Sequence, residues 1–198
     1  MMEALQHQQV RVKVGQYAKN GRTDCGDSYY MLATDDYFLC VLADGLGSGR
    51  YAREASKAVC DTVEKNPDED VDRLMEMCNK SLLKKRGAAV AIVKITFDTK
   101  EVIYSCVGNI RFYFYSENGK LTYPLPVTGY LSGRPQVYKT QNFRYEEGSS
   151  FLFHSDGLQI TRVRPLLQGG KSLEYISSYL HSIVSDADDT TFLIGRLP

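Results

Sequence analysis

The chain has 198 residues, of which 24 are basic and 24 acidic, so it lacks the positive excess typical of nucleic-acid-binding proteins. No apolar stretch approaches the roughly 20 residues that a membrane span requires, and the polar residues 1–9 predict no signal peptide. Five cysteines without a C-x-x-C pair indicate a reducing compartment, and we expect a cytoplasmic protein.

The first predicted elements are three strands in what we expect to be a single domain covering residues 1–198. Apolar and charged residues alternate over residues 9–17, which predicts a half-buried strand. A turn at Asn20-Gly21 separates it from an extended segment over residues 28–33, and a buried strand follows over residues 37–43. We expect the three strands to be consecutive antiparallel neighbours.

A carboxylate and a glycine-rich loop follow the buried strand. Asp44 stands at the strand end, and Gly45, Gly47 and Gly49 let the backbone turn sharply and present a carbonyl to a bound group. Over residues 51–65 the apolar residues recur with a helical period, which predicts a helix. Asp44 therefore lies between a buried strand and a helix, where it is suited to bind a positive group.

Two other interpretations of this loop stay open. Asp44-Gly45 between apolar segments is also a hairpin signal, although the helical period after it disfavours a returning strand. The other is a phosphate-binding loop, but Arg50 stands where the third glycine of the dinucleotide fingerprint belongs.

The second half of the chain mixes strands with two further predicted helices. One helix begins after its cap, Asp70, and runs to residue 85, and the other covers residues 172–184. A segment rich in Pro and Gly over residues 122–136 is a candidate mobile flap. The predicted strands cover residues 88–97, 102–107, 111–115, 137–143, 150–155 and 190–197. Many antiparallel strands, with helices grouped in two places, predict an α+β fold.

Carboxylates stand at the ends of several predicted strands. They are Asp27, Asp44, Asp156 and the pair Asp188-Asp189. Gathering such groups is costly unless a cation neutralises them. Oxygen ligands of this kind suit Mg²⁺ or Mn²⁺, and two such ions can activate a water and clamp a phosphoryl group.

Each of these residues also has a plainer interpretation. Asp27 can be a strand-end turn former, and Asp188-Asp189 can be a solvated loop. His154 lies two residues before Asp156 on the same predicted strand, so both side chains would share a face. His154 is thus a candidate proton donor to a leaving group, with a packed or surface histidine as the alternative.

Four segments in this order carry a resemblance to a known family. They are Arg22-x4-Asp27, Ala43-Asp44-Gly45-Leu46-Gly47-Ser48-Gly49, Ser155-Asp156-Gly157 and Asp188-Asp189-Thr190-Thr191. The set resembles the PPM-type metal-dependent serine/threonine protein phosphatases, and the form Asp-Gly-x-Gly-x-Gly before a helix resembles their bacterial SpoIIE-like branch. The resemblance covers nearly the whole chain.

The resemblance implies an αββα sandwich of two antiparallel sheets flanked by helices, with a binuclear Mn²⁺ or Mg²⁺ site at one end. Asp44 would bridge the ions, the Gly45 carbonyl would hold the first, and Asp156 and Asp188 would hold the second. Asp27 would orient a metal-bound water that attacks phosphorus in line, and Arg22 would bind the substrate phosphate. Asp189 is a further candidate ligand.

Three residues depart from the family pattern. Gly26 stands where many members carry Glu, and Leu46 replaces a His that donates a proton in eukaryotic relatives. Water or His154 would then protonate the serine alkoxide. Asn109 replaces an Asp associated with a weaker third metal, so a third ion is not expected.

The small size without a sensor domain is similar to the stressosome phosphatases of the general stress pathway. This likeness implies phosphorylated STAS-domain proteins as substrates and negative feedback on a stress sigma factor. The alternative is a catalytically silent module of the same fold that binds phosphoproteins without cleaving them.

Overall fold

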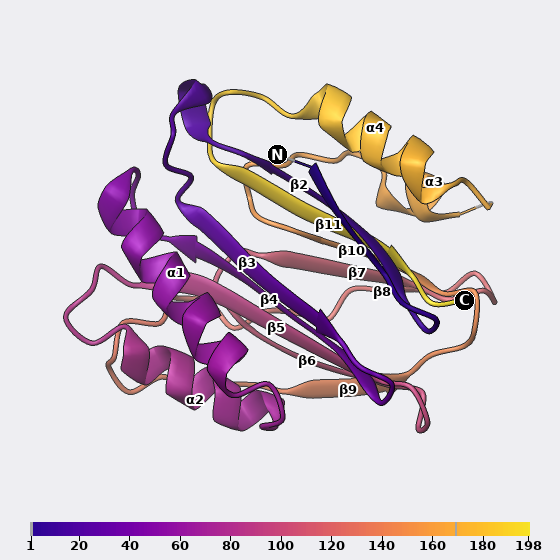
Figure 1. Ribbon diagram of the computed structural model, residues 1–198, viewed down its shortest axis with the longest axis horizontal. Helices are drawn as coiled ribbons and strands as arrows, with labels where there is room; N and C mark the ends of the chain where they lie inside the picture. Colours follow the sequence, from indigo (N-terminus) through magenta and orange to yellow (C-terminus); the bar gives the residue numbers. More distant parts are fainter. Residues whose placement is uncertain (1, 169) are drawn as a thin grey trace.

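Two antiparallel sheets lie face to face in the computed structural model, which describes residues 2–168 and 170–198 (Figure 1). In the described part, the first sheet has the order β1 (Met2–Gln6), β2 (Arg11–Tyr17), β11 (Thr190–Arg196), β10 (Ser150–His154), β7 (Arg111–Tyr115) and β8 (Leu121–Thr122). The second has the order β3 (Asp27–Ala33), β4 (Tyr37–Gly45), β5 (Ala88–Thr96), β6 (Glu101–Val107) and β9 (Gln141–Arg144).

Helices cover the outer face of each sheet, which confirms the predicted α+β sandwich. The second sheet carries α1 (Arg50–Lys65) and α2 (Val71–Ser81), and the first carries α3 (Val163–Leu167) and α4 (Leu173–Ile183) (Figure 1). No helix in the described part of the chain is both long and apolar enough to span a membrane.

Burial on both faces explains the continuous apolar run of β4. Its alternate residues Phe38, Cys40 and Leu42 enter the core between the sheets, whereas Leu39 and Val41 pack under the helices. Every residue from 38 to 43 is buried. A strand covered on both sides loses the alternating polar pattern, so its position at the centre follows from its composition.

The helix boundaries follow from capping groups. The Asp70 side chain accepts a hydrogen bond from Arg73 N at 2.7 Å, and Ser172 does the same for Tyr175 N at 3.2 Å. α2 ends at Ser81, not at residue 85 as predicted, because Lys84 adopts a left-handed φ of 67° that stops the helix.

The expected pairing of the first three strands is confirmed for the second and third, which are the antiparallel neighbours β3 and β4, and is wrong for the first, β2. β2 pairs with β1 and β11 in one sheet, and β3 pairs with β4 in the other. The reason is that Asn20 and Gly21 form part of a short 3-10 helix (Lys19–Gly21) that moves the chain between sheets, and they do not close a hairpin. The sequence prediction also missed β1 and α3, and the strand predicted over residues 137–143 is the shorter β9.

The segment over residues 122–136, predicted as a mobile flap, is hydrogen-bonded to strand β5 and helix α2 around residues 131–134. Leu131 and Ala88 exchange two backbone hydrogen bonds of 2.9 Å, and the Asn79 side chain of α2 holds the next turn. Asn79 Oδ1 accepts from Ser132 N and Gly133 N at 3.1 and 2.9 Å, and its Nδ2 donates to the Arg134 carbonyl at 2.7 Å. Residues 131–134 therefore form a fixed wall beside β5.

Candidate metal centre

Asp27 and Asp44 lie directly opposite each other on neighbouring strands. They are register partners in the antiparallel pair β3–β4, so their side chains point to the same face of the sheet. That face is turned toward β10, because Asp27 Oδ2 accepts a hydrogen bond of 2.6 Å from Ser155 Oγ. Like charges in this position repel, which marks the pair as a place for a compensating positive charge.

Asp27 is almost fully buried, and only one of its two carboxylate oxygens accepts a hydrogen bond. Its exposed fraction is 2%, and its Oδ1 has no hydrogen-bond partner in the described structure. The pKa of Asp27 is raised to about 7, chiefly by burial; the hydrogen bonds from Ser155 and Thr191 oppose the rise, and the charges of Asp189 and Asp156 add a smaller increase. A buried carboxylate with a spare oxygen is costly unless something binds it.

Asp44 is the most strongly perturbed carboxylate of the group. Burial, followed by the charges of Asp27, Asp156, Asp188 and Asp189, raises its pKa to about 8. Five carboxylates therefore act on one another electrostatically at this end of the molecule, although they come from four separate segments. Each of these aspartates stands at or near the end of a core strand, as the sequence motifs indicated.

The loop after Asp44 packs too closely against helix α1 for any side chain at residue 45. A Cβ on Gly45 would lie 1.9 Å from the Ala52 carbonyl oxygen. Gly47 and Gly49 have φ values of 94° and 71°, which glycine adopts without strain. The loop is also tied to the second sheet, since Leu46 N donates to the Gly87 carbonyl at 3.0 Å.

Asp156 and Asp188 form a second acidic group at the rim. Both are exposed, and they border a cavity of about 410 Å³. Partial burial and then the charge of Asp188 raise the pKa of Asp156, whereas Arg111 opposes the rise. Asn109 Nδ2 donates to Asp156 Oδ2 at 2.6 Å, so the residue at the predicted third-metal position is a neutral hydrogen-bond donor.

Asp189 has a different environment from Asp188. It is buried, and its Oδ1 accepts from Lys19 N at 2.9 Å. Its Oδ2 lies 2.8 Å from where a Cβ of Gly26 would be, so the absence of a side chain at residue 26 makes room for this carboxylate. Asp188, by contrast, is exposed: its Oδ1 accepts a hydrogen bond from Asp189 N at 3.0 Å and lies 3.5 Å from Lys19 Nζ.

In the described structure, neither the Arg22 nor the His154 side chain forms a hydrogen bond or ion pair with these carboxylates. Arg22 is exposed at the end of the 3-10 helix. His154 is buried, is paired in register with Arg111 on β7, and stacks on Tyr113, with ring centroids 6.0 Å apart. Burial lowers its pKa to about 4, so the imidazole is neutral at physiological pH.

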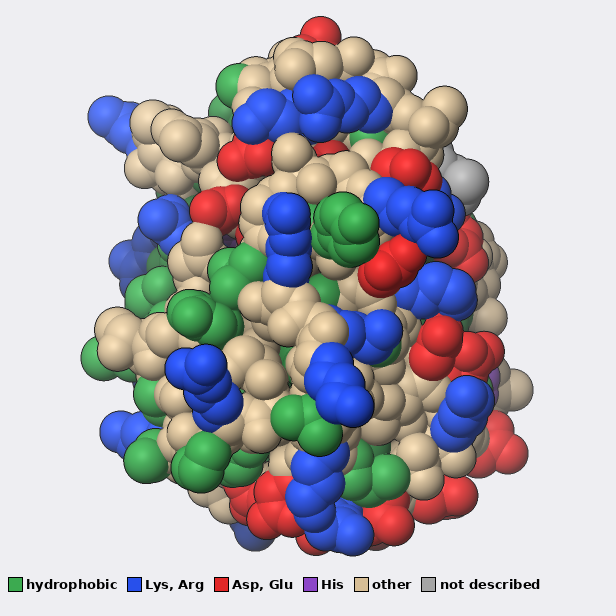
Figure 2. Space-filling view, turned by 90° about the vertical axis from the view of Figure 1, so that its left-hand side faces the viewer, with side chains coloured by type: hydrophobic (Ala, Val, Ile, Leu, Met, Phe, Trp, Pro, Cys, Tyr) green, Lys and Arg blue, Asp and Glu red, His purple; other side chains and the backbone are tan. Residues whose placement is uncertain are grey.

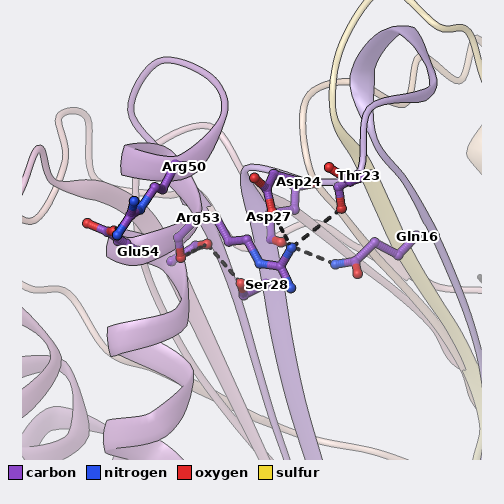
Figure 3. Close-up of polar contacts among 9 residues, drawn as sticks. Gln16, Thr23, Asp24, Asp27, Ser28, Arg50, Arg53 and Glu54 are labelled. Carbon is purple, nitrogen blue, oxygen red and sulfur yellow. Dashed lines mark hydrogen bonds and ion pairs between the residues drawn. The ribbon is translucent and has the colours of Figure 1, made fainter.

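Sequence reasoning missed the groups that support Asp27. Gln16 Nε2 donates to the Asp27 main-chain carbonyl at 3.2 Å. From helix α1, Arg53 Nη1 donates to Asp24 Oδ1 at 2.6 Å and to the Thr23 carbonyl at 3.4 Å (Figure 3). Nothing in the sequence pattern points to these contacts except a cation one helical turn after the glycine loop.

The donor set fits a hard divalent cation in its chemistry. Within residues 2–168 and 170–198, no three acidic, His or Cys side chains converge into a ready-made ion cage. Mg²⁺, however, usually binds through one or two carboxylates and keeps several waters. The excess of negative charge and the unpartnered oxygen of Asp27 are what such an ion would relieve.

Ser155→Ala is expected to lower the free energy of unfolding by about 2 to 3 kcal/mol, because two buried groups lose their partner. Ser155 Oγ donates to Asp27 and also accepts from Thr191 N at 2.9 Å. Urea unfolding of the metal-free protein measures the change. The control is Ser177→Ala, since Ser177 Oγ is equally buried but has no partner in the described structure. Equal effects of the two variants would contradict this role of Ser155.

The sequence of the chain is similar to those of a known family and of a known phosphatase. The sequence model of the family described as Stage II sporulation protein E (SpoIIE) matches residues 34–196. Phosphoserine phosphatase RsbX of Bacillus subtilis strain 168 is 43% identical over 198 residues, which cover the whole of both chains.

Solved structures show the same fold. A crystal structure of RsbX in complex with magnesium superposes with a TM-score of 0.96, at 43% identity and full coverage of both chains. A second structure comes from work on the bacterial stressosome, which is described there as a modular system adapted to control secondary messenger signaling. It superposes with a TM-score of 0.86 at 24% identity. That match covers 96% of this chain and 100% of the other, and at this identity it shows the fold alone.

Proposed function

Because the chain belongs to the SpoIIE family of phosphatase domains, we propose that it is a metal-dependent phosphoserine/phosphothreonine protein phosphatase. The observation that carries the proposal is the opposed pair Asp27 and Asp44, two buried carboxyl groups whose pKa values are raised first by burial and then by the neighbouring aspartates. The full-length similarity to a phosphoserine phosphatase supports the same reaction. In this proposal residues 1–198 form one phosphatase domain.

The proposed cofactors are two Mg²⁺ or Mn²⁺ ions. Asp44 would bridge them with the Gly45 carbonyl on the first ion, and Asp156 and Asp188 would hold the second. When bound, the ions supply a water of lowered pKa as the nucleophile and positive charge for the phosphoryl oxygens. The magnesium in the crystal structure of the relative RsbX supports a divalent cation here.

The chain's own residues would orient and hold the reactants. Asp27, fixed by Ser155, accepts a hydrogen bond from the attacking water and so directs it toward phosphorus. Arg22, exposed at the rim, would pair with the substrate phosphate. The neutral, buried His154 is unsuited to donate a proton at pH 7, so solvent water would protonate the leaving alkoxide. Asn109 would position Asp156 without adding charge for a third ion.

We also propose that the substrates are phosphorylated STAS-domain components of a stressosome, with dephosphorylation as negative feedback on a stress sigma factor. The phosphoserine phosphatase activity named for RsbX, 43% identical over the whole chain, supports a phosphoserine substrate. A cytoplasmic location belongs to the proposal, because all five cysteines are free thiols, as in reducing compartments.

The test is hydrolysis of phosphoserine, phosphothreonine and phosphotyrosine peptides by the metal-free protein, with Mg²⁺ or Mn²⁺ then added. We expect no release of phosphate without metal and release from the first two peptides with it. A phosphorylated STAS-domain protein tests the substrate class in the same assay. Binding of the phosphopeptides without hydrolysis under every metal condition would identify the silent binding module and overturn the enzyme assignment.

A further inference from the structure

A basic patch borders the glycine loop of the candidate metal centre. It consists of Tyr51, Lys84, Lys85 and Arg86, which line a cavity of about 600 Å³ together with Glu54. The chain enters β5 directly after Arg86, and the first residue of β5, Ala88, is the register partner of Gly45. The patch is therefore attached to the loop that follows Asp44.

Arg86 lies over Tyr51 in the first turn of helix α1 and beside Gly47 of the loop. Its guanidinium carbon lies 5.1 Å from the centre of the Tyr51 ring, a cation–π distance. Its Nη1 lies 2.8 Å from where a Cβ of Gly47 would be. The charge of Arg86 is thus positioned beside the loop before any ligand binds.

The positive charge of the patch is not neutralised within the chain. Lys84, Lys85 and Arg86 are exposed, and in the described part of the chain none of them lies within ion-pair distance of a carboxylate. Glu54 borders the cavity but is paired with Arg50 at 2.8 Å. Figure 2 shows this end of the molecule, with Lys and Arg side chains spread over it between hydrophobic ones.

Lys84 stands in a backbone conformation that glycine adopts more easily. Its φ is 67°, and Lys85 N donates to the Leu82 carbonyl at 2.9 Å to close the turn after α2. Glycine is the usual residue at such a helix end, so lysine here carries a conformational cost. Cations at a helix C-terminus also favour the helix dipole, and the experiment below separates that role from binding.

We propose that the basic patch docks an acidic segment of the phosphoprotein substrate, next to its phosphorylated residue. The inference rests on the proposed function and names the kind of substrate that the site prefers. Charge complementarity carries it, since three cations without an ion-pair partner in the described structure line one cavity, and one of them, Arg86, lies beside the loop that follows Asp44. Exposed Tyr51 and Leu83 add apolar contact to the same segment.

Two phosphoserine peptides of one sequence test the proposal, one with four glutamates beside the phosphoserine and one with glutamines there. We expect the protein to hydrolyse the glutamate peptide with a KM about tenfold lower at low salt. The double variant Lys84→Glu/Lys85→Glu should remove this preference by raising that KM about tenfold, with kcat changed by less than about twofold. Its KM for the glutamine peptide and its hydrolysis of an aryl phosphate should stay unchanged.

The matched control is Lys65→Glu/Lys120→Glu, which reverses two exposed charges, one of them in the last turn of helix α1. It should keep the preference for the glutamate peptide. Loss of thermal stability without a change of KM in Lys84→Glu/Lys85→Glu would assign these cations to the helix end and overturn the docking proposal.

Equal KM values for the two peptides in the native protein would also overturn it, while leaving the phosphatase assignment intact. Absence of hydrolysis of both peptides and of the aryl phosphate in the presence of metal would overturn the proposed function, and the docking proposal with it.

Discussion

Asp44→Asn is expected to lower kcat for a phosphoserine peptide by about a thousandfold or more. Metal-derived charge stabilisation amounts to several kcal/mol, and each 1.4 kcal/mol is about a tenfold change in rate. Asp44 is the proposed bridge between the ions, and an amide keeps its shape without its charge. Phosphate release at saturating Mg²⁺ or Mn²⁺ measures the loss.

The same substitution should stabilise the metal-free protein at pH 7 to 8. Burial, and then the neighbouring aspartates, raise the pKa of Asp44 to about 8, far above about 3.9 for an unfolded chain. An acid with a raised folded-state pKa stabilises the fold fully below its unfolded pKa, and this contribution is lost as the pH rises through the folded pKa. The native protein therefore loses stability between about pH 4 and pH 8, and the variant should lose less.

Asp36→Asn is the matched control, because Asp36 is an exposed turn residue just before the same strand. It should keep full activity and an unchanged dependence of stability on pH. Mg²⁺ should raise the melting temperature of the native protein and of this control, but not that of Asp44→Asn. An Asp44→Asn protein that stays active, or that gains no stability at pH 8, would contradict the role given to Asp44.

Gly45→Ala is expected to lower the free energy of unfolding by about 3 kcal/mol or more and to abolish hydrolysis. The added methyl would lie 1.9 Å from the backbone oxygen of Ala52, which no side-chain rotation can relieve. Helix α1 or the loop must move, and the carbonyl proposed to bind the first ion moves with it. Chemical unfolding and phosphate release measure the two effects.

Gly21→Ala separates this clash from the ordinary cost of replacing glycine. Gly21 has a φ of 63°, and a Cβ there would meet nothing within 4 Å. That control should lose only about 1 kcal/mol and keep its activity. Similar losses of stability in both variants would show that backbone freedom, and not the packing of α1, decides the effect at Gly45.

Most of the strands and helices could be predicted because local patterns encode them. The apolar run of β4, the helical period of α1 and the caps Asp70 and Ser172 each depend on neighbours in sequence. The pairing of strands depends on distant partners, and so β2 was assigned to the wrong neighbour. β1 escaped prediction because it is a short edge strand, exposed along most of its length and without a regular alternation of apolar and polar residues.

The candidate site shows the same division. Its carboxylates could be selected from motifs at strand ends, and the structure places Asp27 opposite Asp44. The neighbours that fix their environment could not be selected, because they arise from contacts across the fold. Asp189 fits beside residue 26 only because Gly26 lacks a side chain, and Ser155 reaches Asp27 across the gap between the sheets.

The first and last long strands of the chain are neighbours, since β11 lies between β2 and β10. Ser155, which holds Asp27, is itself bonded to Thr191, and Gln16 bonds to both Asp27 and Thr191. A ribosome-bound chain that has not yet released residues 190–196 therefore cannot complete the centre. The proposed activity is thus expected only after synthesis of this strand, whose pairing with β2 joins residues far apart in the chain.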